Sequence, residues 1–329
     1  MKFGSLRRSA ALLLAVLAAG CGAHANTPVG YEHDPPPDPP RRVARKAPPP
    51  PHVADDAVAQ ARGAVQVTRL SDGAELSGPA LGRELLEYDA ICAGEAHDSA
   101  AQHYGELWLL QRLAARAEDL GLELGLGFEM WAARFQMQLS FFSRGKLSEA
   151  ELLSKTEYET RWGYPFAYYR PLLESARGLG VALIALNAPR ELTEHIAHEG
   201  LGELPASLAR DLPELDLDDP KHRADFEKRM KHHPGLEPGD LDRYYAAQVV
   251  WDETMAQNSS RWLDYHTPSR RILILAGQAH CQHSAIPGRI ERRAARRAAA
   301  VLLATEPVPS DAREQYDYAL VVTGSAKSD

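Results

Sequence analysis

Between about residues 57 and 323, short apolar runs alternate with longer stretches in which apolar residues recur at helical spacing. Short, mostly apolar runs are typical of buried parallel strands. They predict such strands at 90–93, 122–128, 181–186, 271–276, 301–304 and 318–322. Residues 64–70 alternate instead and precede Ser71-Asp72-Gly73, which predicts an edge strand or hairpin. Because strands alternate with helices, the pattern predicts an α/β fold with a mostly parallel sheet flanked by helices.

Two stretches of the chain, 132–178 and 190–263, are helical in pattern and rich in aromatic and charged residues. They are long for simple crossover connections between strands. We therefore expect them to form a smaller helical cap domain beside the sheet. The α/β domain with its cap is expected to span residues 57–323, and residues 324–329 to form a tail.

The first 56 residues have the composition of an export signal and a tether. Residues 1–20 combine a basic start with a short apolar run, and small residues precede Cys21, which is typical of a lipoprotein signal peptide. Residues 21–56 are rich in proline and favour an extended chain that does not fold. We expect Cys21 to be lipidated and to anchor the chain in the outer membrane. The alternative is an ordinary secretory peptide with an incidental cysteine.

Net charge and cysteine content narrow the classes of protein. The chain of 329 residues carries 45 acidic and 37 basic side chains and a net charge of −8, which argues against a general nucleic-acid binder. Three cysteines are too few for a disulfide framework. Cys92 and Cys281 either pair in an oxidising compartment, or Cys92 is a small buried hydrophobic residue.

Polar side chains follow three of the predicted buried strands. His97 and His280 each come shortly after such a strand, and Glu129 comes at the end of another, with Glu95 close to His97. Because ligands of open α/β sheets bind beyond the carboxyl ends of the strands, we expect these side chains to converge there. Two imidazoles and a carboxylate suit a divalent metal ion, or a histidine base that activates water. The alternative is that these groups cap helices and hydrogen-bond the loops.

A series of short motifs extends from about residue 65 to residue 323. They are Gly94-Glu95-Ala96-His97-Asp98 with His103, Phe128-Glu129-Met130, Trp162-Gly163, Tyr169-Arg170-Pro171, Ala185-Leu186-Asn187-Ala188-Pro189, Gln248, Trp251-Asp252-Glu253-Thr254-Met255-Ala256, and Ala276-Gly277-Gln278-Ala279-His280 with Pro287. In combination these motifs resemble the ChaN-type haem-binding lipoproteins. The resemblance implies an iron-regulated, membrane-anchored haem binder with an α/β core, a smaller helical domain, and haem held at a contact in a homodimer.

The paired Gly-x-x-His pattern is also similar to a wider group that contains erythromycin esterase and Tiki-type metalloproteases. This second resemblance implies a hydrolase. In that case His97, Glu129 and His280 would bind a divalent metal ion or activate water against an ester or amide.

A haem binder needs an iron ligand, which in proteins is commonly histidine or tyrosine. Tyr244 and Tyr245 open a predicted helix, and His232 and His233 precede it. We expect the ligand to be among these four residues, and Trp251 and Met255 to pack on the macrocycle. The alternative is that the apolar residues of this helix form the buried stripe of a cap helix.

The sequence thus leaves two functional hypotheses from different classes. The first is an outer-membrane lipoprotein, with its domain in the periplasm or at the cell surface, that binds haem for iron uptake or storage. The second is a hydrolase that uses His97, Glu129 and His280. A purely structural envelope lipoprotein is a third alternative, which predicts neither activity.

Overall fold

The computed structural model describes residues 53–202, 204–231, 239–265 and 269–324. Cys21, the tether up to residue 52, and the candidate ligands His232 and His233 lie outside the described residues. The described residues belong to one compact unit.

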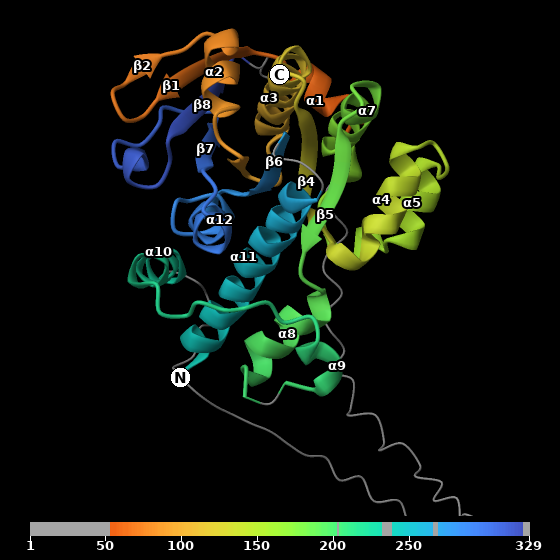
Figure 1. Cartoon of the computed structure of the whole chain (residues 1–329), viewed down its shortest axis with the longest axis vertical. Coiled ribbons are helices and arrows are strands. Elements are labelled where there is room, and N and C mark those ends of the chain that lie inside the picture. The colour runs from red at the N-terminus through yellow and green to blue at the C-terminus, as the bar shows by residue number, and fades with distance from the viewer. Residues whose placement is uncertain (1–52, 203, 232–238, 266–268, 325–329) are drawn as a thin grey trace, which may run out of the picture. The chain divides into compact units, whose positions relative to one another are not determined.

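A single eight-stranded sheet forms the centre of this unit, with strand order β2-β1-β8-β7-β3-β6-β4-β5 (Figure 1). Its strands are β1 (Ala64–Arg69), β2 (Ala74–Glu75), β3 (Ala90–Glu95), β4 (Glu123–Ala132), β5 (Ala182–Asn187), β6 (Arg270–Gly277), β7 (Ala298–Ala304) and β8 (Tyr318–Thr323). Strands β3 to β8 run parallel to one another, and β1 is antiparallel to both β2 and β8. The predicted α/β class with a mostly parallel sheet is therefore confirmed.

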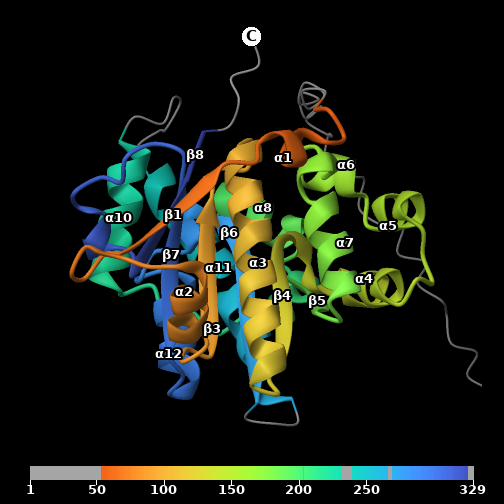
Figure 2. The same cartoon turned by 90° about the horizontal axis from the view of Figure 1, so that it is seen from above.

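Helices surround the sheet (Figure 2). They are α1 (Ala57–Gln60), α2 (Gly78–Leu85), α3 (Ala100–Asp119), α4 (Gln136–Ser143), α5 (Glu149–Lys155), α6 (Tyr158–Arg161), α7 (Arg170–Gly178), α8 (Arg190–Glu199), α9 (Ala206–Ala209), α10 (Pro220–Met230), α11 (Asp240–Asp264) and α12 (Ile286–Ala294). No helix of the described ranges is both long and apolar enough to cross a membrane.

The two faces of the sheet carry different helices because alternate side chains of each strand point to opposite faces. On β6, Leu273 and Leu275 pack in one core with apolar residues of α2, α3 and α7. Ile272 and Ile274, one position earlier in each case, pack in a second core with residues of α11 and α12. Burial on both faces explains why the central strands are apolar runs in the sequence.

Both stretches predicted to form the helical cap are helical in the structure. Helices α4 to α7 leave the end of β4 and return to β5, and α8 to α11 lie between β5 and β6. In Figure 1, α8 and α9 lie beyond the end of β5, and α11 extends from there back along the sheet. The carboxyl ends of the strands are thus covered by helices on one side.

Strand β5 is at the edge of the sheet, where unpaired backbone groups are exposed to other chains. The side chain of Gln136, at the start of α4, bonds this edge from outside. Its Nε2 donates to the carbonyl of Leu183 over 2.9 Å, and its Oε1 accepts from the amide of Ala185 over 2.8 Å. The amide therefore replaces the missing neighbour strand for one residue pair.

Candidate functional site

Strands β3, β6 and β4 are neighbours in the sheet, so the residues at their carboxyl ends come together. His280, in the short turn Gln278–His280 after β6, has its Nε2 3.3 Å from Glu129 Oε1 of β4. The amide of Gly277 donates to the other Glu129 oxygen over 2.8 Å. A Cβ atom on Gly277 would lie 3.1 Å from the His97 ring, so only glycine allows this close approach without displacement. The structure therefore brings His97, Glu129 and His280 together at the carboxyl edge of the sheet. We call the place where these three side chains meet the rim.

His280 is paired with a carboxylate at each ring nitrogen. Its Nδ1 is 2.5 Å from Asp252 Oδ1, on α11, and its Nε2 faces Glu129. Burial alone would lower the pKa of His280, but the charges of Glu129 and Asp252 and its bonds to both raise it to about 10. Burial would raise the pKa of Glu129, but the charge of His280 and its bond to that residue lower it to about 2. At neutral pH this rim therefore holds an imidazolium between two carboxylates.

Asp252 is completely buried and bridges two histidines. Its second oxygen lies 3.0 Å from Nε2 of His222, which α10 contributes, and accepts from Gln248 over 3.3 Å. His222 is held in turn by Arg289, whose guanidinium is 3.2 Å from its Nδ1. These partners fix the orientation of the His280 ring from behind.

His97 lies on the other side of the rim. Its Nδ1 donates to Glu95 Oε1 over 2.6 Å, and its ring packs edge-on against Trp162 at 4.8 Å. Burial lowers the pKa of His97, but the bond to Glu95 and the charges of Glu129 and Glu95 outweigh it, and the net shift is upward. Glu95 therefore orients His97 as Asp252 orients His280.

Cys92 and Cys281 form a disulfide across 189 residues, which decides between the two alternatives left open by the sequence. Cys92 lies in the middle of β3, and Cys281 directly follows His280. The bond ties the turn that carries His280 to the central strand of the sheet.

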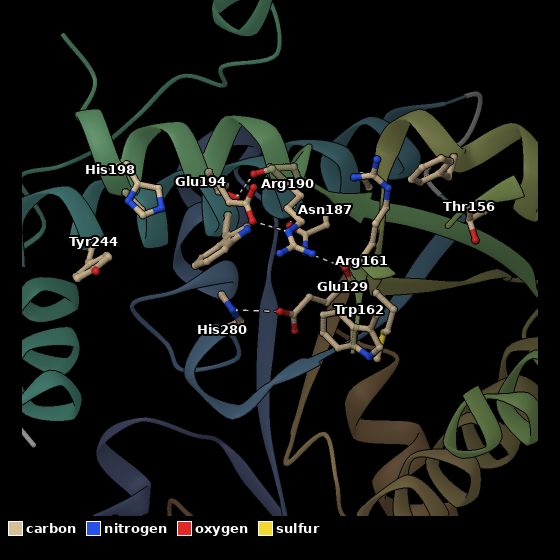
Figure 3. A pocket seen from close by; sticks show the side chains of 17 residues that line it. Glu129, Thr156, Arg161, Trp162, Asn187, Arg190, Glu194, His198, Tyr244 and His280 are labelled. Carbon is tan, nitrogen blue, oxygen red and sulfur yellow. Dashed lines mark hydrogen bonds and ion pairs between the residues drawn. The ribbon is translucent and has the colours of Figure 1, made fainter. Parts of the chain in front are cut away.

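A hollow with a volume of about 470 Å³ opens beside His280 and Glu129 (Figure 3). We call it the strand-end hollow; it lies between α8, α11 and the ends of β4 and β5. Much of its lining is apolar or aromatic: Met130, Ala132, Phe135, Trp162, Ala188, Ala197 and Trp251. Arg161, Arg190 and Glu194 lie at the opening of the hollow. A hollow of this volume and lining is typical of a site for a small organic molecule.

The structure separates the residues expected to contact haem. Tyr244 and Trp251 line the strand-end hollow. Tyr245 does not: it is buried, and its hydroxyl is 3.2 Å from His222 Nδ1. Met255 is completely buried between α11 and the sheet and has no free surface for a macrocycle. For Met255 the expected contact is therefore wrong in this structure, because its position on the apolar stripe of α11 faces the sheet.

His198 is a residue of the hollow that sequence reasoning missed. It lies on α8 and, in Figure 3, on the same side of the hollow as Tyr244 of α11. The only signal in the sequence was its place near the end of an amphipathic helix, which is common for solvated histidines. An imidazole and a phenol that line one hollow are both groups that bind haem iron.

The predicted metal ligands His97, Glu129 and His280 share a rim, but they are not the three-residue group whose ligand atoms lie closest. Over the ranges that the structure describes, one group of three brings a ligand atom of each residue within 4.8 Å of the others. It consists of Glu95, His103 and Glu106. Of the residues proposed for a metal, this group includes only Glu95.

The fold and this rim define a class: α/β proteins with paired histidine motifs at the carboxyl ends of neighbouring parallel strands. Within that class, the chain belongs to the family described as haem-binding uptake, Tiki superfamily, ChaN, whose model matches residues 81–290. The predicted resemblance to ChaN-type proteins is therefore confirmed.

Two solved structures illustrate the likeness. The structure of cofacial haem binding to ChaN of Campylobacter jejuni is 18% identical, covers 79% of this chain and 97% of that chain, and has a TM-score of 0.61. An erythromycin esterase in its open conformation is 14% identical, covers 79% of this chain and 83% of that chain, and has a TM-score of 0.41. The first shows that the fold is shared. No curated protein matches the chain significantly.

Proposed function

We propose that this chain is a haem-binding lipoprotein of the bacterial envelope that serves haem or iron uptake or storage. Membership of the ChaN family supports haem binding. The proposed haem site rests on one observation: Tyr244 and His198 line the same largely apolar hollow. Bound haem would supply an iron centre that takes tyrosinate or imidazole as a ligand.

The lining of the strand-end hollow fits such a ligand. Trp251, Trp162 and Ala188 offer apolar surface for a macrocycle. Arg161 and Arg190 lie at the opening of the hollow, where they would contact the haem propionates. Arg190 is now paired with Glu194, but this ion pair is exposed and contributes little, so exchange for a propionate costs little. Arg161 is less exposed and is paired with both Glu157 and Glu191.

We further propose that the chain acts as a homodimer. The opening of the hollow is exposed at Arg190, Glu194 and His198. A planar molecule in the hollow would therefore keep part of its surface in water. A second copy would cover that surface. The Campylobacter jejuni protein is described as binding haem cofacially, and two copies of this chain that meet at their hollows would allow such an arrangement here.

The anchor proposal rests on the sequence before residue 57. A lipidated Cys21 followed by a proline-rich tether up to residue 56 would hold the domain away from the outer membrane. One lipid-modified terminus fits the family's expected place in the envelope.

A haemin titration of the purified chain tests the haem proposal. Trp251 and Trp162 line the hollow, so bound haem should quench tryptophan fluorescence until a defined ratio is reached. Saturation together with a visible absorption band of ligated iron is the expected result. Quenching that rises without saturation would reflect unspecific adsorption of a hydrophobic molecule and would refute the proposal.

A hydrolase is the second candidate function, and a specific observation favours it. Asp252 and Glu95 each orient one rim histidine, so a proton donor, His280 Nε2, lies beside the carboxylate of Glu129. In such a pair the imidazolium can donate a proton to a leaving group, and the carboxylate can accept one from water. In this case His97→Ala should abolish hydrolysis in a panel of esters, whereas Tyr244→Phe should leave it unchanged. Absence of turnover in the wild type would exclude this function for the esters tested.

A further inference from the structure

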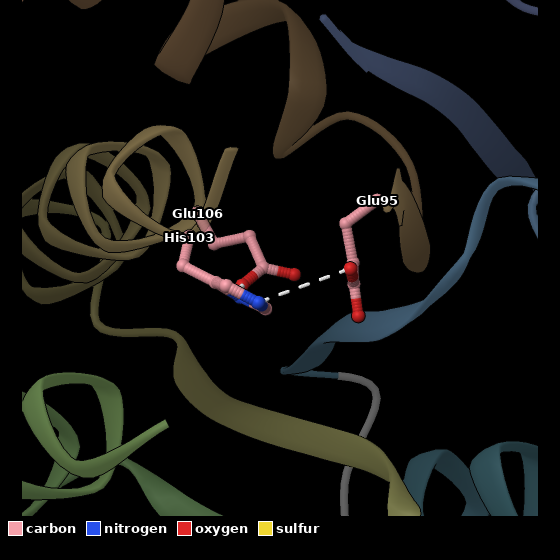
Figure 4. Close-up of side chains that lie close together, drawn as sticks. All are labelled: Glu95, His103 and Glu106. Atoms are coloured by element: carbon pink, nitrogen blue, oxygen red, sulfur yellow. Dashed lines mark hydrogen bonds and ion pairs between the residues drawn. The ribbon is translucent and has the colours of Figure 1, made fainter. Parts of the chain in front are cut away.

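A cluster of buried ionisable side chains lies behind the rim, on the face of the sheet covered by α3 (Figure 4). Glu95 is the last residue of β3, and His103 and Glu106 lie on α3. The helical spacing of His103 and Glu106 places both on one face of α3, toward Glu95. The side chains of Glu95 and His103 and the whole of Glu106 are shielded from solvent. None of these side chains lines the strand-end hollow.

The cluster holds two carboxylates for a single imidazole. His103 Nδ1 donates to one oxygen of Glu106 over 2.8 Å, and His103 Nε2 lies 4.0 Å from Glu95 Oε2. Among the described residues, Glu95 Oε2 and the second oxygen of Glu106 have no hydrogen-bond partner. A buried carboxylate oxygen without a donor is costly, so the cluster lacks a positively charged or donating group at this point.

Neighbouring groups do not supply that charge. The ring of His103 is stacked against Tyr168 at 4.9 Å and meets Tyr169 edge-on at 4.8 Å. The Tyr169 hydroxyl donates to Glu95 Oε1, the oxygen that already holds His97. The nearby Tyr158 hydroxyl is itself buried without a partner. The surroundings are therefore aromatic and uncharged, apart from His97.

We propose that Glu95, His103 and Glu106 bind a divalent transition-metal ion, with Zn²⁺ as the best match. Imidazole nitrogen together with carboxylate oxygen is a donor set that Zn²⁺ accepts, and Mn²⁺ is the second choice for its oxygen ligands. Without an ion, His103 Nε2 donates to the carbonyl oxygen of His97 over 3.2 Å, so an ion bound to Nε2 would replace this proton and leave the carbonyl as a further oxygen ligand. One ion would satisfy both unpartnered carboxylate oxygens at once.

The ion would have a positioning role rather than a catalytic one. It has no contact with the hollow, but it would fix Glu95, whose other oxygen holds the His97 ring at 2.6 Å. The inference does not depend on haem binding, because none of its three ligands is a candidate haem contact. A buried water molecule is the main competing occupant, since it would also donate to the unpartnered oxygens.

Metal content of the untagged, full-length chain tests the proposal. After removal of loosely bound ions by dialysis against excess metal-free buffer, elemental analysis should find about one zinc ion per chain when ZnCl₂ is supplied during folding. Glu106→Gln keeps the shape of the side chain but removes its charge, and should lower the bound zinc at least about tenfold. Glu118→Gln, at an exposed position of the same helix, should retain it.

Glu129→Gln separates this cluster from the rim. Zinc retained by Glu129→Gln and lost by Glu106→Gln supports the buried site. Zinc lost by Glu129→Gln and retained by Glu106→Gln would place the ion at the rim and overturn the proposal. A wild-type chain that holds no zinc or manganese, and gains no thermal stability from either salt, would show that water or protons fill the cluster.

The X-ray absorption spectrum of zinc in the wild-type chain keeps the test decisive even where Glu106→Gln does not fold. The buried site supplies one imidazole and otherwise oxygen ligands, whereas the rim supplies the two imidazoles of His97 and His280. A spectrum with a single imidazole is expected. A spectrum with two would contradict the proposal.

Discussion

His280 is the most strongly constrained ionisable residue of the rim, with Asp252 on one ring nitrogen and Glu129 on the other. A histidine in this setting stays protonated at neutral pH and therefore does not act as a base. Its charge balances part of the negative charge that Glu129 and Asp252 bring into a buried region. The pairs stabilise the fold only in the pH range where both members are charged.

The stability that His280 contributes should therefore depend on pH. Its pKa is 6.5 when exposed and about 10 in the fold, so the contribution is complete below pH 6.5 and is lost as pH rises through about 10. Glu129 sets the acid limit: its contribution is complete above pH 4.5 and is lost as pH falls through about 2. The free energy of unfolding of the wild type minus that of His280→Gln should be largest between these limits, in urea titrations across the range.

Gln282→Ala provides the control for this pH series, because it changes the same loop without removing a titrating group. Its difference from the wild type should not follow the decline seen with His280→Gln between pH 6.5 and 10. A His280→Gln difference that stays constant over that range would show that His280 is neutral in the folded chain.

Residues that follow strands were easier to predict than residues on helices. His97, Glu129 and His280 could be grouped from the sequence because their strands are parallel, and neighbouring parallel strands end at one edge. Asp252, His222 and His198 come from three helices, and the sequence does not say which helix faces the rim. Partners that depend on helix packing were for this reason outside the reach of sequence patterns.

At the scale of elements, α11 contacts two different surfaces along its length. Near its start, Ala246, Ala247 and Val250 pack against α8, beside the hollow lined by Tyr244 and Trp251. Farther on, Met255, Ala256 and Leu263 pack against the sheet. A single apolar stripe in the sequence thus serves two surfaces, which explains why Trp251 lines the hollow and Met255 does not.

The Cys92–Cys281 disulfide links two elements that the chain separates by 189 residues. Because a cross-link over such a long segment restricts the unfolded chain, its reduction should lower the free energy of unfolding by about 2–5 kcal/mol. Urea denaturation with and without a reductant measures this change.

The double variant Cys92→Ala/Cys281→Ala is the control for this experiment. Its denaturation midpoint should be the same with and without reductant, and lower than that of the oxidised wild type. Equal midpoints for the oxidised and reduced wild type would show that the bond does not contribute to stability.

At the scale of the whole molecule, the number and order of the buried strands along the chain could be read from the sequence, but their order in the sheet could not. Strand β3 lies between β6 and β7, which come from the far end of the chain. The apolar pattern of a buried strand shows that both of its faces are covered, but it does not show which strands it pairs with. The predicted class of sheet was right, but the neighbours of each strand within the sheet came only from the structure.

The envelope anchor is a whole-molecule prediction that concerns Cys21. If this residue is lipidated, Cys21→Ser should move the chain from the membrane fraction to the soluble fraction of a Gram-negative cell. Ala25→Ser, in the following tether, should remain in the membrane fraction. Equal distribution of wild type and Cys21→Ser would contradict a lipid anchor.

The most direct test of the haem proposal compares two neighbouring tyrosines on α11. Tyr244 lines the strand-end hollow, whereas the Tyr245 hydroxyl bonds to His222 in the interior. In haemin titrations followed by visible absorption, Tyr244→Phe should weaken binding by roughly tenfold or more and change the spectrum of the ligated iron, while Tyr245→Phe should bind as the wild type does. Wild-type affinity and spectrum in Tyr244→Phe would contradict the proposal that this residue holds the iron in the hollow.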